Sequence, residues 1–370
     1  MQAPEHFHGR QWITALFAAV TVVVYLAAFT VSASAQRPPT DRHVPELARY
    51  FNGVKIAAPI TEQGLAVYPV LVDDVPLLKG KWQALDQAID RGTLVVREKG
   101  GGSVPTVTVQ NRSRDAYILL MTGDVIKGGM QTRTVRHDTV LGPRQRIDLD
   151  VFCVEAQRWN GSPVFSAGKM QAPQSIKGEI RNGGSQADVW SRVAENNRSL
   201  GTENATRSLE AAIQAPAVKD KLDAVRKRVV PEVPRGTVGF IFTSSNGAAG
   251  AEFFGSEALA RAELPQLLDS YAVDFIIRGK PIAVFRNILP DNKAATSFFE
   301  RICREGSERT KTAGAGAGIR TDSAGLIGDG VSLDSTLVHF GVQVGPNVPA
   351  KPKLPPPNQY DLPEGQRNRH

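Results

Sequence analysis

The chain has 370 residues, of which 41% are hydrophobic and 22% are charged, so it can bury one large core or two modest ones, and its composition excludes wholesale disorder. The formal net charge of +7 favours anionic ligands or an anionic membrane face, and a solvated basic surface accounts for it as well. Aromatic residues are not interleaved with Lys and Arg, which argues against a nucleic-acid partner.

An uncharged apolar segment at residues 13–31 follows a polar N-terminus, and Ala33-Ser34-Ala35 then offers a cleavage site before Gln36. This is the pattern of a secretory signal peptide, so the mature chain is expected to be extracytoplasmic, either periplasmic or secreted. The segment is also about long enough to span a bilayer. An uncleaved membrane anchor is therefore the alternative. We expect contact with a membrane only through this segment, and only if it is not cleaved.

The rest of the sequence divides into three parts. Residues 36–50 are polar and contain Pro, which is typical of a linker. Residues 51–344 carry the apolar patterns of a folded domain. Residues 345–370 are rich in Pro and polar residues, so we predict a disordered tail there.

The first half of the folded part is predicted to be mostly β. Trp82, Leu85 and Ile89 lie on one face of a predicted helix, which Gly92 ends. Segments rich in β-branched and alternating apolar residues predict strands at residues 65–72, 93–97, 104–110, 116–121 and 147–154.

The second half mixes helices and strands. Residues 166–185 show little apolar pattern and are predicted to form an exposed loop. Periodicity predicts helices around residues 189–193, 218–229, 256–275 and 298–302, and strands at 237–242 and 331–344. Pro265, inside the third helix, would kink it or split it in two. The predicted fold class is therefore α+β, with an N-terminal β-rich part and a mixed helix–strand part that share one core.

Cysteines and histidines do not indicate a metal centre. Cys153 and Cys303 are the only cysteines, and one extracytoplasmic disulfide or two buried free thiols both fit the sequence. The histidines outside the export segment are far apart and form no ligand motif. We therefore expect neither a bound metal nor a cofactor.

The first candidate cluster spans residues 123–133, directly after a predicted buried strand, where scaffolds often present functional groups. Gly128 and Gly129 would let a ligand approach the backbone, while Asp124, Gln131 and Arg133 offer an acid, an amide and a cation. A β-turn with surface charges explains the same residues. The cluster is neither a Walker loop nor a G-x-G-x-x-G fingerprint.

The second cluster, at residues 153–159, ends the predicted strand at 147–154. Arg158 suits a phosphate or carboxylate, Trp159 can stack on a ring, and Glu155 is able to bind or protonate a ligand. A Glu155–Arg158 ion pair beside a core Trp is the alternative.

Two Gly-rich stretches, at residues 313–318 and 328–330, form the third cluster. Their backbone amides could cradle an anion, and a flexible loop explains them as well.

Taken in order, the first two clusters and their surroundings resemble the ARG and Rhodanese-Phosphatase-superfamily-associated Protein domain family. The resemblance covers roughly residues 51–344. It combines a strand leading into a Gly-acidic loop, a Val-Glu-…-Arg-Trp strand end, two helix motifs and a late Val-His strand. The residues that carry it are Leu85, Asp86, Ala88, Leu119, Leu120, Gly123, Asp124, Gly128, Gln131, Arg133, Cys153, Val154, Glu155, Arg158, Trp159, Gln186, Val189, Trp190, Ser270, Tyr271, Ala272, Asp274, Val338 and His339.

The chain departs from the family's pattern at three positions, where Met130, Thr132 and Gln157 replace the usual Lys, Asn and Gly. The family's name refers to ADP-ribosylglycohydrolases, rhodaneses and phosphatases. By association alone, this implies a link to ADP-ribose or nucleotide-derived metabolites. An exported member fits poorly with intracellular nucleotide chemistry.

Three functional hypotheses follow. The first is an exported domain that binds a small anionic ligand of a nucleotide-like or ADP-ribose-like kind at the first two clusters. The second is a hydrolase or transferase with Asp124 or Glu155 as general base and Arg133 or Arg158 against negative charge. The third is a structural or protein-interaction domain of the cell envelope. The first two require Asp124, Gln131, Arg133, Glu155 and Arg158 to converge on one partly open pocket.

Overall fold

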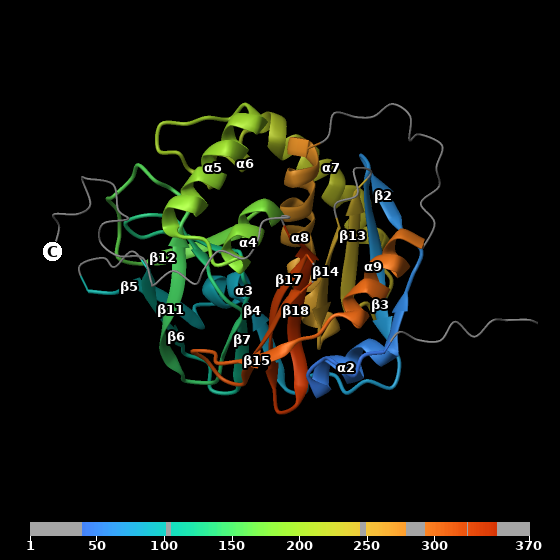
Figure 1. The fold of residues 1–370 in the computed structure, drawn as a ribbon. Helices are drawn as coiled ribbons and strands as arrows, with labels where there is room; N and C mark the ends of the chain where they lie inside the picture. The colour runs from blue at the N-terminus through green and yellow to red at the C-terminus, as the bar shows by residue number, and fades with distance from the viewer. Residues whose placement is uncertain (1–38, 101–104, 245–248, 279–292, 324, 346–370) are drawn as a thin grey trace, which may run out of the picture. The chain divides into compact units, whose positions relative to one another are not determined.

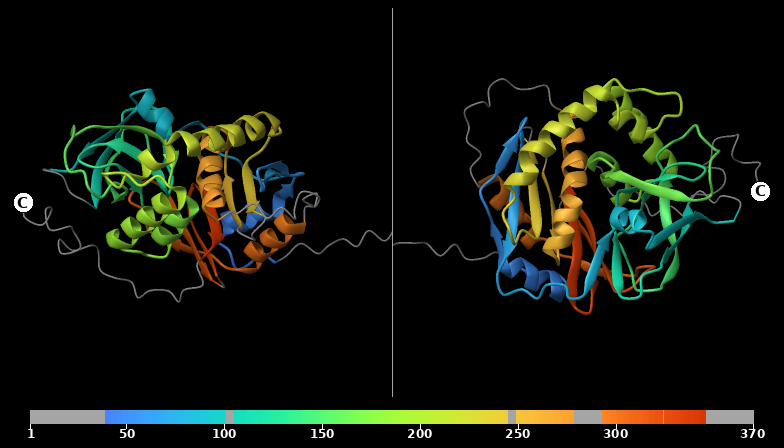
Figure 2. Two further views of the ribbon diagram at one scale, coloured as in Figure 1. Left: turned by 90° about the horizontal axis from the view of Figure 1, so that it is seen from above. Right: turned by 180° about the vertical axis from the view of Figure 1, so that it is seen from behind.

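The computed structural model describes residues 39–100, 105–244, 249–278, 293–323 and 325–345 (Figures 1 and 2). The predicted export segment and the Pro-rich tail from residue 346 onward lie outside these ranges. Among the described helices, none combines the length and hydropathy needed to cross a membrane.

A nine-stranded antiparallel sheet runs through the domain in the order β1-β3-β13-β14-β18-β17-β16-β15, and β2 pairs with β3 on the same side as β1. It joins strands from both ends of the sequence. Its strands are β1 (Val54–Ile56), β2 (Ile60–Glu62), β3 (Leu65–Val72), β13 (Gly239–Ser244), β14 (Ala249–Phe254), β15 (Glu308–Thr310), β16 (Ala317–Ser323), β17 (Leu326–Leu333) and β18 (Thr336–Val344).

Both faces of this sheet are covered by helices, because its central strands are apolar on both sides. On β13, Phe240 and Phe242 point into a core shared with α8 (Glu257–Arg278), while Ile241 points to the opposite core with α2 (Pro45–Gly53) and α9 (Lys293–Arg304). Figure 2 shows these helices on the two sides of the sheet. Alternating side chains on one strand thus contribute to two hydrophobic cores.

Two smaller sheets contain the middle of the β-rich half. A three-stranded sheet, β10-β7-β4, contains β4 (Lys81–Ala84), β7 (Ala116–Leu120) and β10 (Thr139–Leu141). A six-stranded antiparallel sheet, β12-β8-β9-β11-β6-β5, contains β5 (Leu94–Glu98), β6 (Thr106–Asn111), β8 (Asp124–Gly128), β9 (Arg133–Val135), β11 (Arg146–Cys153) and β12 (Phe165–Gln171). The short helix α3 (Leu85–Asp90) packs on the apolar face of these strands.

The remaining helices pack against the core on the α8 side. They are α4 (Gln174–Arg181), α5 (Gln186–Leu200), α6 (Leu209–Ile213) and α7 (Pro216–Val229), which continues into the 3-10 turn η1 (Val230–Glu232). Helix α5 begins at a capping box made by Ser185 and Asp188 and ends at Gly201, which has a left-handed backbone. These local signals explain why the helix has these bounds.

The predicted α+β class is confirmed, and one core does join the two halves, because Val67 and Leu119 pack in the same cluster as Phe242 and Leu268. Three local differences concern helices. Helix α2 begins at Pro45, inside the segment predicted as a linker, since Leu47 and Tyr50 are buried against the sheet. Trp82 lies on β4, not on a helix, and α8 runs unbroken through Pro265.

The predicted exposed loop at residues 166–185 is wrong. This segment forms β12 and α4. Most of residues 170–181 are buried, whereas Ser166 and Lys169 on β12 are exposed. Helix α4 buries Gln174, Lys177 and Arg181 together with Ile176 and Ile180. Ile176 and Ile180 are the only large apolar residues on the buried face of this eight-residue helix, so its apolar pattern is too short to predict a buried helix.

Candidate functional site: a buried acid–base network beneath a polar pocket

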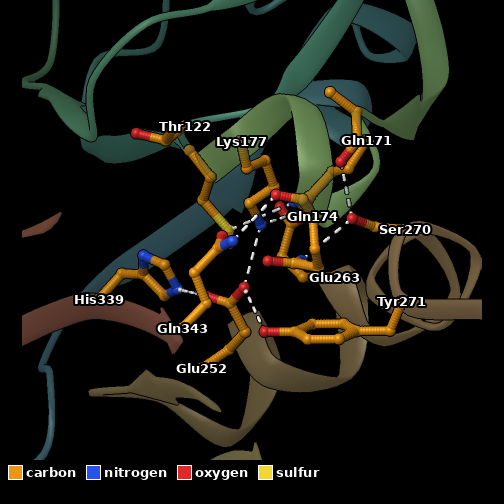
Figure 3. A network of polar contacts seen from close by, with 12 residues as sticks. Thr122, Gln171, Gln174, Lys177, Glu252, Glu263, Ser270, Tyr271, His339 and Gln343 are labelled. Atoms are coloured by element: carbon orange, nitrogen blue, oxygen red, sulfur yellow. Dashed lines mark hydrogen bonds and ion pairs between the residues drawn. The ribbon is translucent and has the colours of Figure 1, made fainter. Parts of the chain in front are cut away.

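Helix α4 places a fully buried lysine at the centre of the domain. Lys177 has 0% of its surface exposed, and its Nζ donates to Gln171 Oε1 at 3.2 Å and to Glu252 Oε1 at 2.9 Å (Figure 3). Its aliphatic stem passes over Gly123, where an added Cβ would lie 2.8 Å from Lys177 Cδ. Gly123 also has a φ of +97°, so this position favours glycine for two reasons.

Glu252 on β14 receives three donors. Lys177 Nζ and Tyr271 Oη donate to its Oε1, the latter at 3.2 Å, and His339 Nε2 lies 3.1 Å from its Oε2 (Figure 3). Burial alone would raise the pKa of this carboxyl, but the charge of Lys177 and the hydrogen bond from His339 outweigh it and hold the pKa well below its usual range. Glu252 is therefore ionised in the interior.

His339 on β18 lies between two carboxylates. Its Nδ1 is 2.5 Å from Asp138 Oδ2, and its Nε2 faces Glu252. Burial lowers the pKa of His339, whereas the charge and hydrogen bond of Asp138 and those of Glu252 raise it to about 9. Because an ionised carboxylate only accepts hydrogen bonds, both ring nitrogens carry protons and the side chain is an imidazolium at neutral pH.

Two further carboxyls share one amide on the other side of Lys177. Gln171 Nε2 donates to Asp124 Oδ1 at 2.9 Å and to Glu263 Oε2 at 3.3 Å. Burial raises the pKa of Asp124 to about 7, and burial together with the charges of Asp124 and Asp86 raises the pKa of Glu263 well above its usual value. Near neutral pH this pair therefore holds protons.

A second cation of α4 reaches the opposite end of the network. Arg181 Nε donates to Asp329 Oδ1 at 2.6 Å, and Arg181 Nη1 donates to Gln343 Oε1 at 3.0 Å. Thr122 ties this end together, because its backbone N donates to Asp138 Oδ1 at 2.8 Å and its hydroxyl donates to Asp329. Asp138 and Asp329 are thus held side by side, each backed by a buried cation.

A polar pocket of about 290 Å³ opens onto the carboxylate of Asp329, whose side chain is 13% exposed, whereas the side chain of Asp138 has no exposed surface. It lies where the three sheets meet, between β10, β11 and the β15–β17 strands. Its polar lining includes Asp138, Asp150, Glu308, Lys311, Arg320 and Asp329. The pocket and the network together make the strongest candidate site in the described part of the chain.

Both Gly-rich stretches of the third cluster reach this pocket, through Ala313, Gly318, Asp329 and Gly330. They do not form a loose loop: residues 328–330 are part of β17, and the Ala315 backbone N donates to Val140 O at 2.8 Å. A Cβ on Gly314 or Gly316 would lie about 2 Å from a backbone oxygen, so these glycines allow close packing of the chain.

The first two clusters split between two places. Asp124 belongs to the acid–base network, whereas Arg133 lies in a separate buried group, where its Nη1 donates to Gln131 O at 3.2 Å and contacts Cys153 Sγ at 2.9 Å. Glu98 is its ion-pair partner at 3.5 Å, and Trp159 lies 5.8 Å from its guanidinium carbon.

Glu155 and Arg158 pair with each other at 2.8 Å beside that group. Arg158 also donates to the backbone oxygens of Gly128 and Gly129, at 3.2 and 2.9 Å. The seven other candidates therefore gather around Arg133 and Arg158, although Arg133 Nε and Nη2 are buried without a hydrogen bond, and Asp124 does not join them. The convergence on one open pocket that the first two hypotheses required is not seen among these residues.

A family model described as the ARG and Rhodanese-Phosphatase-superfamily-associated Protein domain, ARPP-1, matches residues 53–342. The chain belongs to this family. The resemblance found in the sequence is thereby confirmed, and its predicted extent of residues 51–344 agrees closely with the matched range. No curated protein and no solved structure matches the chain.

Several residues that carry the ARPP-1 resemblance hold the network in place. On α8, Asp274 Oδ2 accepts from the Ser175 backbone N at 2.7 Å, and the Ser270 hydroxyl accepts from Gln174 Nε2 at 3.1 Å. Both contacts fix the first turn of α4, where backbone N–H groups otherwise have no partner. The Ser-Tyr-Ala-…-Asp motif thus positions the helix that supplies Lys177, and its Tyr271 donates to Glu252.

Met130, one of two residues in the first cluster that depart from the ARPP-1 pattern, lies outside the network. Its backbone N donates to Glu98 Oε1 at 2.8 Å, in the group around Arg133. The replacement of Lys at this position therefore removes no member of the acid–base network.

Most of the network belongs to no cluster predicted from the sequence: these residues are Lys177, Arg181, Glu252, Glu263 and Asp138. Asp329 lies within the third cluster. One signal was present. Glu252 and His339 each stand within an otherwise apolar strand, as in Ala251-Glu252-Phe253 and Val338-His339-Phe340. Since charged residues are rarely buried without partners, an ionisable residue inside such a strand is a marker of an interior polar site.

Among the described residues, no group of His, Cys, Asp and Glu side chains has the arrangement of a metal site. Cys153 and Cys303 are both buried and unbonded. The question that the sequence left open is thus decided in favour of free thiols.

We expect both thiols to be inert in the native protein. Burial raises the pKa of Cys153 to about 11 and that of Cys303 to about 12, so neither forms the reactive thiolate near neutral pH. Titration with a disulfide reagent should detect two thiols after denaturation and react very slowly before it. Fast labelling of the native protein, or fewer than two thiols in the denatured one, would contradict this.

Proposed function

We propose that the domain binds a small ligand in the pocket above Asp329, and that this ligand carries hydroxyl groups and an anionic group, as a sugar phosphate does. The observation that carries the proposal is the Asp329 carboxylate at the pocket, which is paired with the buried Arg181 and lies beside the buried Asp138–His339 pair. Buried charged networks at the floor of a pocket are a common mark of functional sites.

The carboxylates favour hydroxyl groups over a cationic ligand. An ionised carboxylate only accepts hydrogen bonds, so the ligand must supply the donors. The charges of Asp138 and Asp329 are balanced by His339 and Arg181, which leaves little net negative charge to attract a cation. Neutral donors such as sugar hydroxyls fit this arrangement best.

The rim supports one anionic group on the ligand. Lys311 and Arg320 line the pocket, and Lys311 makes no ion pair with another described residue. Asp150 and Glu308 share the rim, so a dense negative charge would be repelled. A single phosphate or carboxylate close to Lys311 would pair with this cation and would keep the repulsion from Asp150 and Glu308 small.

The volume of the pocket limits the size of the ligand that it can hold. A cavity of about 290 Å³ lies at the lower end of the range for small-molecule sites, which is roughly 300–1,000 Å³. It has room for a sugar phosphate. An ADP-ribose-like or nucleotide-like ligand would therefore enter with its ribose-phosphate end.

The test uses ribose 5-phosphate as the probe, with ribose and inorganic phosphate as its two halves. Calorimetric titration should show binding of the whole probe that is stronger than that of either half. Replacing the exposed Lys311 by Ala should weaken binding by roughly tenfold, since a charge-assisted hydrogen bond contributes about 1.5–3 kcal/mol. Asp148→Asn, a change at an exposed carboxylate outside the pocket, is the control and should bind as the wild type does.

The outcome that would contradict the proposal is an absence of binding by ribose 5-phosphate and by nucleotides that contain it. If wild type and Lys311→Ala bind ribose 5-phosphate with equal affinity, Lys311 is not part of the ligand site.

We also propose that this binding takes place outside the cytoplasm, because residues 13–35 have the sequence pattern of an export signal. N-terminal sequencing of the protein recovered from cells tests it. A start at Gln36 is expected for a cleaved signal, and a cytoplasmic chain that starts at Met1 would contradict export.

A further inference from the structure

We propose that the outer face of strands β5, β6 and β11 is a docking surface for an anionic lipid membrane, which it binds through Arg97, Arg112, Arg144 and Arg146. These four residues, all exposed, form the arginine face. The three strands are neighbours in the six-stranded sheet (Figure 1). The sequence predicts membrane contact only through residues 13–31, so the arginine face is a second contact, made by the folded domain and independent of the ligand pocket.

The register of the three strands sets two of the arginines in adjacent rows of the sheet. Arg97 lies opposite Thr108, and Arg146 lies opposite Gln110, two residues further along β6. Side chains two residues apart on a strand point to the same side of the sheet. The other side carries buried apolar residues, such as Val109, that pack in the core with α3. Arg97 and Arg146 therefore both point outward.

Arg112 and Arg144 form the next row, just beyond the ends of β6 and β11. The Arg112 backbone N donates to Thr93 O at 2.7 Å, and the Arg144 backbone N donates to Ser113 O at 3.1 Å, so the chains stay paired there. Strands lie about 4.8 Å apart and alternate residues about 7 Å apart, so the four arginines spread over roughly 10 by 14 Å.

The charge of this face is positive and largely unbalanced. None of its four arginines forms an ion pair with another described residue. Lys99 and Asp148, on the same side of the sheet, pair with each other at 2.7 Å, and Asp150 lies at the far end, beside the ligand pocket. Five cations against two carboxylates leave a net charge of +3 on these strands, compared with +7 for the whole chain.

A membrane fits the arginine face better than a strand of nucleic acid does. No aromatic side chain lies on the outward side of these rows, so bases have nothing on which to stack. The hollow of about 550 Å³ between Arg97 and Arg146 is open to solvent and does not enclose a small molecule. Arginine pairs well with phosphate, and phospholipid headgroups present many phosphates in one plane. The predicted export signal would also bring the domain to a cell envelope, where a bilayer is close.

Sedimentation with lipid vesicles tests this contact, and the protein to use is the chain that begins at Gln36. Every described helix and strand lies after residue 38, so this chain keeps the folded domain and lacks the apolar segment, which would itself enter a bilayer. Vesicles of equal parts phosphatidylglycerol and phosphatidylcholine are compared with vesicles of phosphatidylcholine alone. We expect binding to the anionic vesicles only, and a decrease in this binding as the salt concentration rises.

Arg97→Gln combined with Arg146→Gln is the test variant. We expect it to bind the anionic vesicles roughly 20-fold more weakly, since each Arg near an anionic surface strengthens binding by a factor of about five. Arg207→Gln combined with Arg235→Gln is the matched control. Both of these arginines are exposed, lie outside the three strands and form no ion pair with a described residue. The control removes the same two charges and should bind nearly as wild type does.

Three results would overturn the proposal. One is an absence of binding to the anionic vesicles at low salt. Another is an equal loss of binding in the test and control variants, which would show that the total charge acts and not this face. The third is binding of single-stranded DNA or polygalacturonate through Arg97 and Arg146 without binding to vesicles. Ribose 5-phosphate binding is measured separately and should be the same in both variants, so a failure here leaves the proposed function standing.

Discussion

Lys177→Met is expected to lower the free energy of unfolding by about 3–5 kcal/mol, which is the typical effect of removing one partner of a buried ion pair. Methionine fills a similar volume, so little of the loss comes from a cavity. What it removes is the cation that donates to Glu252 and Gln171 inside a fully buried network. Glu252 would then remain ionised in the interior with weaker compensation, or take up a proton.

Urea unfolding of the purified domain measures this change. Lys127→Met is the matched control, because Lys127 is also paired with a glutamate, but its side chain is 53% exposed. Exposed ion pairs contribute less than about 1 kcal/mol, so the control should remain close to wild type. Similar small losses in both variants would show that the interior ion pair contributes no more than a surface one.

Gly341→Ala is expected to destabilise the domain by about 1–3 kcal/mol, since overpacking a filled core forces neighbours from their positions. The added Cβ would lie 2.2 Å from Glu252 Oε2 and 2.5 Å from Arg181 Nη2. Both atoms belong to buried charged side chains with fixed partners, so neither can move away at small cost.

Gly142→Ala is the control for this change. The nearest atom to its added Cβ is Gln145 Oε1 at 3.4 Å, which is ordinary contact, and the backbone there does not require glycine. Thermal unfolding of the two variants should give a clearly lower transition temperature for Gly341→Ala alone. A Gly341→Ala protein as stable as the control would mean that Arg181 and Glu252 are not packed as described.

The buried charges themselves support a functional reading of this region. A core of apolar residues is often as stable as one that contains ion pairs, or more so, because burying charge requires desolvation. Yet this domain places Lys177, Arg181 and His339 together with Glu252, Asp138 and Asp329 in or beside its central core. Departures from ordinary packing rules of this kind concentrate at functional sites.

The strands could be predicted from the sequence because their side chains are either alternating or continuously apolar. Segments such as Ala116–Leu120 and Gly239–Ser244 show this directly, and the structure confirms the predicted strands there within a few residues. Pairing between the two halves of the chain, such as β3 with β13, depends on contacts that a local pattern does not contain.

The candidate site was only partly predictable, for a physical reason. Asp124 was identified from the Gly-rich loop, but its partners Gln171 and Lys177 lie in a segment predicted to be exposed, because polar residues normally face solvent. In this domain, Asp124, Gln171 and Lys177 face one another in the interior. Such a network is recognisable only when each polar group can be matched with its partner, and those partners come from α4, α8, β14 and β18.

The Arg133 group shows the opposite case. A dense set of polar residues, Gln131, Arg133, Glu155 and Arg158, predicts a ligand site from sequence, yet their polar atoms are largely taken up by one another and by backbone oxygens. Proximity in sequence identified a real cluster in space. It did not distinguish residues that hold a loop together from residues that face a pocket.

The most direct test of the ligand site is a crystal structure of the mature domain soaked with ribose 5-phosphate. We expect the probe in the pocket between β11 and β15–β17, with a sugar hydroxyl at Asp329 and the phosphate close to Lys311. The proposed ligand site would be contradicted if a saturated crystal showed the probe at the Arg133 group or at any other surface and not in this pocket.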